Sequence, residues 1–187
     1  MKLIFKFMLM VLCFGNLFSC TTQQAINPRQ EALLKLMDKR LRIAPLVAKS
    51  KWNTKAPIDD PVRERIILDS VKVKSKKMGM GDELVVPFFQ AQFDAGKIIQ
   101  KQMHSKWRAE NHPSFDPAPN LATDIRPVLD SLTLQLLLEL KNNEIERLDT
   151  QSTKRLRKLA RKVISSEFSD DVVETAIKPL GLIGRSN

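Results

Sequence analysis

Along most of this chain, apolar residues recur at intervals of three and four, the period of an amphipathic α-helix. The segment from Gln30 to about Trp52 shows the pattern clearly, at Leu33, Leu34, Met37, Leu41, Leu46 and Val47. We find no run with the alternating pattern of a strand, and the 187 residues include no tyrosine and only 6 glycines. The sequence therefore predicts an all-α fold and argues against sandwiches and barrels.

Prolines, glycines and capping residues divide the chain into about six expected helices. Asp60-Pro61 is a strong start signal, because aspartate suits the N-cap and proline the first helical position. That helix should last to about Lys77, and Asp82 should cap the next one. Pro45 should kink or distort the first helix. The later helices are expected over residues 82–110, 122–147, 150–168 and 169–180.

The first 19 residues differ in kind from the rest. Lys2 and Lys6 precede an apolar run over residues 7–18, which is too short to span a bilayer comfortably. Small or polar residues follow it. This layout predicts a secretory signal peptide over residues 1–19 and a periplasmic or secreted protein, with a retained membrane anchor as the alternative. Residues 28–187 would then form a single helical domain.

Cysteine occurs only at Cys13 and Cys20, in or beside the expected signal. The mature domain therefore has no internal disulfide, no Cys-based metal site and no cysteine nucleophile. The string Leu17-Phe18-Ser19-Cys20 looks like a bacterial lipoprotein box, in which Cys20 would be lipidated after cleavage. Phe18 is unusual in its position, and cleavage at a nearby small residue without lipidation is the alternative.

The chain is strongly basic, with a formal net charge of +10. Such a surface suits nucleic acid, an anionic membrane or small anionic substrates, and composition does not choose between them. The basic run from Lys154 to Lys162 is better explained as a solvated helix face than as a nucleic-acid or lipid contact. His104 and His112 lack spaced partners, so the sequence predicts no metal site.

The residues that could carry chemistry lie in the first two expected helices. Arg40 and Lys51 are eleven residues apart, which returns them to nearly the same helix face three turns along. A second group, Asp60, Arg63 and Glu64, begins the next helix and combines a cation with acidic partners. The alternative is that these basic residues are solvated surface charges, as most are in so basic a chain.

As a whole, the pattern resembles the all-α chorismate mutase family, the AroQ class. That family carries an Arg, a Lys eleven residues on, and then Asp-x-x-Arg-Glu, matched here by Arg40, Lys51, Asp60, Arg63 and Glu64. A later helix of the family has an aromatic, a small or hydroxyl residue and then Gln or Glu, matched by Phe89, Gly96 and Gln100. Gly96 replaces the common Ser or Thr and lacks their hydroxyl.

The exported (gamma) subclass of that family adds a C-terminal helical extension, which supplies one more arginine to the active site. Its local pattern is matched by Leu121, Arg126 and Asp130-Ser131-Leu132, with one extra residue before Arg126. Trp52 and Trp107 also lie where that subclass has tryptophans. The resemblance covers about residues 31–132 and implies a homodimer whose protomers each hold a complete site.

The resemblance implies an isomerase that rearranges chorismate, a dianion, into prephenate without metal, cofactor or nucleophile. Arginine matches a carboxylate through two parallel hydrogen bonds, so the substrate carboxylates are assigned to Arg40, Arg63 and Arg126. The ether oxygen, where negative charge develops, is assigned to Lys51 and Gln100. The remaining candidates are Asp60 and Glu64, for the substrate hydroxyl or the cations, with Glu64 preferred for the hydroxyl. Gly96 would contact the substrate through its backbone or a water.

Two other functions remain open at this stage. The protein could be an enzyme remnant or sensor that binds chorismate-like dianions without fast turnover, which Gly96 would permit. It could also be a basic helical protein that binds nucleic acid or the cell envelope. The last hypothesis explains the charge of the chain but not the intervals between the site residues, and we therefore expect no nucleic-acid partner.

Overall fold

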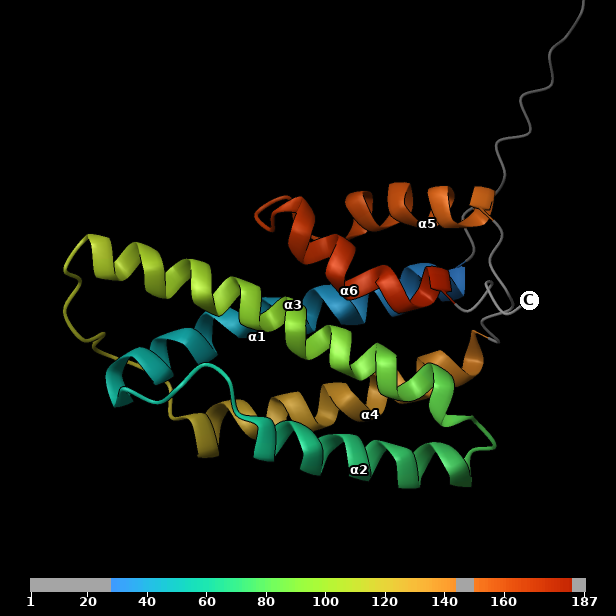
Figure 1. The fold of residues 1–187 in the computed structure, drawn as a ribbon, viewed down its shortest axis with the longest axis horizontal. Coiled ribbons are helices and arrows are strands. Elements are labelled where there is room, and N and C mark those ends of the chain that lie inside the picture. Colours follow the sequence, from blue (N-terminus) through green and yellow to red (C-terminus); the bar gives the residue numbers. More distant parts are fainter. Residues whose placement is uncertain (1–27, 144–149, 183–187) are drawn as a thin grey trace, which may run out of the picture.

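The computed structural model describes residues 28–143 and 150–182, which form six α-helices and one short π-helix, with no strand in those ranges. The expected all-α class is confirmed (Figure 1). The expected signal peptide and Cys20 lie outside the described residues. In chain order the helices are α1 (Pro28–Thr54), α2 (Pro61–Lys77), α3 (Asp82–Ala109), η1 (Leu121–Ile125), α4 (Arg126–Asn142), α5 (Thr150–Val163) and α6 (Asp170–Leu182).

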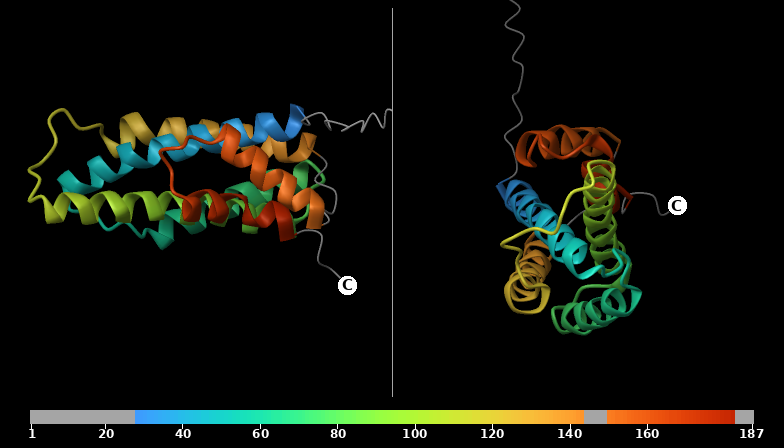
Figure 2. Two further views of the ribbon diagram at one scale, coloured as in Figure 1. Left: turned by 90° about the horizontal axis from the view of Figure 1, so that it is seen from above. Right: turned by 90° about the vertical axis from the view of Figure 1, so that its left-hand side faces the viewer.

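The two longest helices, α1 and α3, form the centre of the bundle. Helices α2 and α4 cover one side of this pair, and α5 and α6 cover the other (Figures 1 and 2). The side chains between them are almost fully buried, as for Leu34, Met37, Phe88, Phe89, Leu136 and Leu137. Each such side chain stabilises the fold by about 1.5–3 kcal/mol relative to an exposed position.

Helix α2 begins as the sequence predicts. The side chain of Asp60 accepts a hydrogen bond from the backbone N–H of Arg63 at 3.0 Å, and Pro61 occupies the first helical position. This cap fixes the start of the helix and therefore the direction in which Arg63 and Glu64 leave it.

The predicted cap of α3 is wrong. Gly81, with an extended backbone, is the N-cap residue, and Asp82 is already the first residue of the helix. The turn that ends α2 explains the difference. Met80 donates its N–H back to the carbonyl of Ser75 at 2.9 Å, and Gly79 adopts a φ of 76°, so only Gly81 remains to join the two helices.

Helix α1 continues through Pro45, which removes one backbone donor but does not end the helix. The buried neighbours Leu41, Ala44 and Ala48 hold both halves of the helix against α3 and α4. Lys51 therefore stays in helical register with Arg40, as the spacing of eleven residues requires.

The basic run on α5 forms a solvated face. Leu156 and Leu159 are buried, while the cations around them are exposed. Two of these cations are paired with α6 residues, Arg157 with Glu174 at 2.8 Å and Arg161 with Asp170 at 3.2 Å.

Candidate active site

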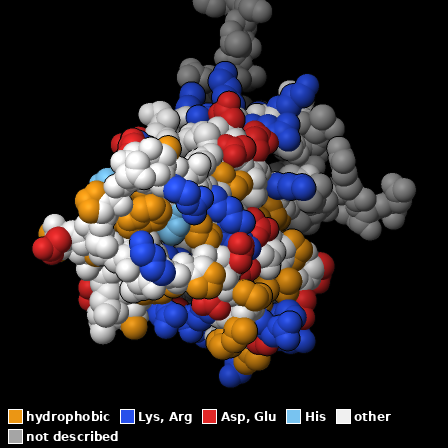
Figure 3. All heavy atoms as spheres, turned by 60° about the vertical axis from the view of Figure 1, so that its left-hand side comes forward, with side chains coloured by type: hydrophobic (Ala, Val, Ile, Leu, Met, Phe, Trp, Pro, Cys, Tyr) orange, Lys and Arg blue, Asp and Glu red, His pale blue; other side chains and the backbone are white. Residues whose placement is uncertain are grey.

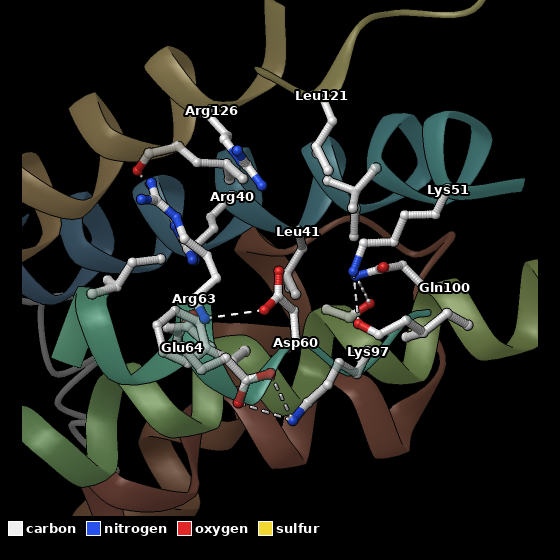
Figure 4. A pocket seen from close by; sticks show the side chains of 18 of the residues that line it. Arg40, Leu41, Lys51, Asp60, Arg63, Glu64, Lys97, Gln100, Leu121 and Arg126 are labelled. Atoms are coloured by element: carbon white, nitrogen blue, oxygen red, sulfur yellow. Dashed lines mark hydrogen bonds and ion pairs between the residues drawn. The ribbon is translucent and has the colours of Figure 1, made fainter. Parts of the chain in front are cut away.

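A cavity of about 130 Å³ opens between α1, α2, α3 and the start of α4. This is far more than the ~10–15 Å³ that a single water needs. All eight site residues expected from the sequence line it, namely Arg40, Lys51, Asp60, Arg63, Glu64, Gly96, Gln100 and Arg126. Figure 4 labels all of them except Gly96. The cavity brings together residues from four helices, although the chemical role of each residue stays a prediction.

Arg40 is buried without an ion pair. Its side chain donates to Thr133 Oγ1 at 3.3 Å and lies over the ring of Phe93 at 5.4 Å. No carboxylate within the described ranges comes within 4.0 Å of its guanidinium. Burial lowers the pKa of Arg40 to about 10, against the opposing charge of Asp130. A buried cation in this state is costly, and a bound anion would offset that cost.

Lys51, three turns further along α1, is the second buried cation. Its Nζ donates to the carbonyl oxygen of Ile58 at 2.7 Å. Burial lowers the pKa of Lys51, the carboxylates at positions 59, 60 and 64 oppose this shift, and the charge of Arg126 adds to it. An ammonium group has three N–H donors, so two remain for a ligand.

Gln100 and Gly96 face the cavity one turn apart on α3. The amide Nε2 of Gln100 donates to the carbonyl oxygen of Gly96 at 3.2 Å, and its Oε1 is buried without a partner in the part of the chain that the structure describes. One amide N–H is left for a ligand. A Cβ atom at position 96 would meet Ala44 Cβ at 3.9 Å and Gln100 Nε2 at 4.0 Å, which is ordinary contact.

Arg63 reaches across from α2 to α4. Its Nη2 donates to Asp130 Oδ1 at 3.1 Å and, more weakly, to Oδ2 at 3.4 Å. Asp130 is a site residue whose role the sequence did not predict, although it begins the Asp-Ser-Leu motif. Its partner lies on another helix, so spacing along the chain could not identify the pair.

Glu64 is held by two residues of α3. Lys97 Nζ lies 3.1 Å from Oε1 and 3.2 Å from Oε2, and Gln90 Nε2 donates to Oε2 at 3.2 Å (Figure 4). Lys97 also lines the cavity, and sequence reasoning missed it. The available signal was its place between Gly96 and Gln100, on the same face of the helix as Gln100.

A π-turn directly before α4 positions Arg126 at the cavity. The backbone N–H of Arg126 bonds to the carbonyl of Leu121, five residues back, and Asn120 caps the turn by accepting from Ala122 and Thr123. Such a turn holds one residue more than an α-turn. We infer that it accommodates the one extra residue that precedes Arg126 relative to the pattern of the exported subclass.

Among the residues that the structure describes, no group of three or more His, Cys, Asp or Glu side chains could hold a metal ion. In the same residues, no helix combines the length and apolarity needed to cross a membrane.

Comparison with curated proteins points to one family. The family model for type II chorismate mutases matches residues 23–101. A secreted chorismate mutase from Yersinia pestis is 28% identical over 102 residues, which are 54% of this chain and 54% of that protein, so the match spans about half of the relative's length. A monofunctional chorismate mutase from Enterobacter agglomerans is 24% identical over 161 residues, which are 84% of this chain and 77% of that protein.

Solved structures agree with this result. The chorismate mutase from Burkholderia thailandensis is 31% identical, with a TM-score of 0.74, and the match covers 82% of this chain and 99% of that one. The chorismate mutase from Burkholderia phymatum is 25% identical with a TM-score of 0.71, covering 82% and 98%. The chain belongs to the type II chorismate mutase family, the AroQ class.

Proposed function

We propose that this protein is a chorismate mutase, an isomerase that converts chorismate to prephenate. One observation carries the proposal. Arg40 and Lys51 are both buried on the cavity side of α1, and neither has a carboxylate within 4.0 Å in the described part of the chain. A site with such a deficit of negative charge suits a small dianion.

Three arginines would bind the two carboxylates of the substrate. They approach the cavity from α1, α2 and the start of α4, and are Arg40, Arg63 and Arg126. Arginine fixes the orientation of a carboxylate as well as its charge. Holding the two ends of the substrate in the folded, reactive conformer contributes several kcal/mol, up to ~7–11 kcal/mol in well-oriented reactions.

The chemical step needs stabilisation of charge rather than proton transfer. The ether C–O bond breaks while a new C–C bond forms, and negative charge builds on the ether oxygen. Lys51 and Gln100 each have N–H donors without a partner among the described residues, and both line the cavity. Removing one such preorganised donor typically costs about 3–4 kcal/mol of transition-state stabilisation.

Turnover by purified residues 28–187, measured as loss of chorismate absorbance, tests the function. We expect the parent to be active and Lys51→Ala and Arg63→Ala to lose at least ~100-fold in kcat/KM. The exposed Lys39, one position before Arg40, provides a control, because Lys39→Ala should change little. Tight binding of a cyclic dicarboxylate without turnover would favour a catalytically weak dianion-binding protein instead.

Nucleic-acid binding is the less favoured function. Lys and Arg side chains on the face in Figure 3 are interspersed with acidic and apolar groups. Retention on DNA that falls steeply with salt, together with no chorismate turnover, would favour it over the enzyme.

We further propose that the protein is exported, with a signal peptide over residues 1–19 and one domain over 28–187. The N-terminal sequence supports this, as do two relatives that are named secreted chorismate mutases. Intact mass of the protein from an expressing bacterium tests it. A chain that still begins at Met1 would refute cleavage of a signal peptide and favour a retained membrane anchor. A mass increase that Cys20→Ala abolishes would establish the lipidation of Cys20.

A homodimer is also proposed. Large apolar side chains are exposed on the neighbouring helices α2 and α4, at Val62, Ile66, Val73, Val128, Leu134 and Leu138. Such a surface gains free energy by burial against a second copy. Sedimentation should give a dimer for the parent and a monomer for Ile66→Asp combined with Leu138→Asp. A parent that is monomeric at micromolar concentration would contradict this.

A further inference from the structure

The carboxylate of Glu64 has little freedom within the cavity. Its side chain and that of Lys97 are each only 19% exposed, and Lys97 Nζ lies 3.1 and 3.2 Å from its two oxygens. Gln90 adds a second hydrogen bond to Oε2, at 3.2 Å. A carboxylate offers about four lone-pair positions. Both hydrogen bonds use Oε2, so Oε1, which among the described residues is in contact only with the charge of Lys97, can still accept a hydrogen bond.

The ammonium group of Lys97 is surrounded by protein carboxylates. Besides Glu64, its Nζ contacts Asp94 Oδ1 at 2.9 Å, while Asp59 lies further away at 3.9 Å. Burial tends to lower the pKa of Lys97, but its hydrogen bonds to Asp94 and Glu64 raise it overall. The ammonium therefore stays charged and directed at protein carboxylates. Lys51 differs from Lys97, because its one hydrogen bond within the described ranges goes to a backbone carbonyl.

The position of Glu64 and Lys97 within the cavity suggests which group donates a hydrogen bond to Oε1. Figure 4 shows Lys97 and Glu64 at one edge, with Arg126 at the opposite edge and Lys51 and Gln100 together at a third side. If carboxylates bind at the arginines and the ether oxygen at Lys51, the ring hydroxyl is the substrate group left for Glu64. A hydroxyl donates to a carboxylate in a strong, charge-assisted hydrogen bond.

We propose that Lys97 is a positioning residue that fixes Glu64 with one oxygen presented to the ring hydroxyl, and so makes the site selective for a hydroxylated ring. The inference rests on the proposed chorismate mutase function. Without Lys97, the Glu64 side chain would gain rotamer freedom and could turn toward other cations of the cavity. The hydroxyl would then lose its preorganised acceptor.

Binding of a matched pair of inhibitors tests the proposal independently of turnover. The probes are a bicyclic ether dicarboxylate that mimics the rearranging skeleton, and its counterpart without the ring hydroxyl. By calorimetry, the parent should prefer the hydroxylated compound by about tenfold or more, the effect of one hydrogen bond to a charged group. In Lys97→Met this preference should fall to about twofold or less, while Lys97→Arg should retain most of it.

Lys101→Met is the matched control. Lys101 lies one turn along the same helix and is paired with Asp59 at 3.2 Å rather than with Glu64. Its replacement should leave the preference unchanged. Because both residues act on one contact, Lys97→Met combined with Glu64→Gln should lose no more preference than either change alone.

The outcomes separate the two proposals. An unchanged preference in Lys97→Met overturns the role of Lys97, and so does an additive loss in the double variant. A parent that binds both dicarboxylates but does not turn over chorismate refutes the proposed function, while the inhibitor ratio still decides the role of Lys97.

Discussion

At the scale of single residues, the site depends on cations that the protein buries without neutralising. Burial strengthens the electrostatic attraction of Arg40 and Lys51 for an anion, because two charges interact more strongly where water is excluded. The same burial disfavours the charged form, so it lowers the pKa of both groups. The buried cations therefore lower the stability of the protein with an empty site and raise its affinity for an anion.

The lowered pKa of Lys51 predicts a limit to activity at alkaline pH. Lysine is charged only below its pKa, and burial moves that limit downward from 10.5. We expect kcat/KM to fall at a lower pH than that at which ordinary lysines deprotonate, about 10.4. In Lys51→Arg the rate should be lower, but its decline should shift to higher pH. A decline at the same pH in both proteins would show that another group controls it.

The amide at position 100 leads to a prediction for activity at acidic and neutral pH. An amide donates a hydrogen bond at any ordinary pH, so the parent rate should be flat between about pH 5 and 8. A glutamate at this position must be protonated to donate to the ether oxygen. Gln100→Glu should therefore lose kcat/KM steeply as the pH rises through about 6. A flat profile for Gln100→Glu would remove Gln100 from the ether oxygen.

Gly96 leaves space that a hydroxyl could use. A Cβ atom there would make only ordinary contacts, and the residue lies inside α3, where glycine costs up to about 1 kcal/mol relative to alanine. Gly96→Ser should raise both the Tm and the affinity for the dicarboxylate inhibitor. Gly96→Ala separates the two effects, because it should raise the Tm without improving affinity. A fall in Tm for both variants would contradict this expectation.

At the scale of helices, the sequence predicts local signals well and pairing between helices poorly. The Asp60 cap and the bounds of α2 follow from the residues that form them. The cap at Asp82 was wrong, because the preceding turn decides which residue is last outside the helix. The pairs Lys97–Glu64 and Arg63–Asp130 join separate helices, and only the packing of those helices brings them into contact.

The π-turn before α4 predicts how the chain tolerates a deletion. Loss of Ala122 should convert this turn to an α-turn and leave Arg126 in register with the buried face of α4, so most of the activity should remain. Val128 lies beyond the turn, inside α4. Its deletion should rotate Arg126 by about 100° relative to that face. Chorismate turnover should then fall sharply. Equal losses in both variants would mean that the π-turn does not absorb the extra residue.

At the scale of the whole molecule, the bundle supports the site at a cost in its own stability. The core residues of α1, α3 and α4 pack around Arg40, so most of this cation is removed from water and only its cavity side is accessible. The overall helical class follows from apolar periodicity alone. The shortage of carboxylates beside the buried cations of the cavity could not be predicted in this way. It depends on how far each carboxylate lies from Arg40 once the helices have packed.

This trade-off can be measured with Arg40→Met, which replaces the buried cation by an apolar side chain of similar length. The groups that Arg40 contacts would remain satisfied, since Thr133 Oγ1 already donates to the carbonyl of Leu129 at 2.8 Å. We expect the Tm of the unliganded protein to rise, by about 2–4 °C for each kcal/mol gained in a chain of this size. The stabilisation given by a dicarboxylate inhibitor, about 2.7 kcal/mol at 100 times its Kd, should disappear. Arg42→Met, at an exposed cation paired with Asp38 at 2.7 Å, is the control and should leave that stabilisation intact. If Arg40→Met instead lowers the Tm, the buried guanidinium stabilises the folded protein. In that case its burial is not a cost that a bound anion offsets.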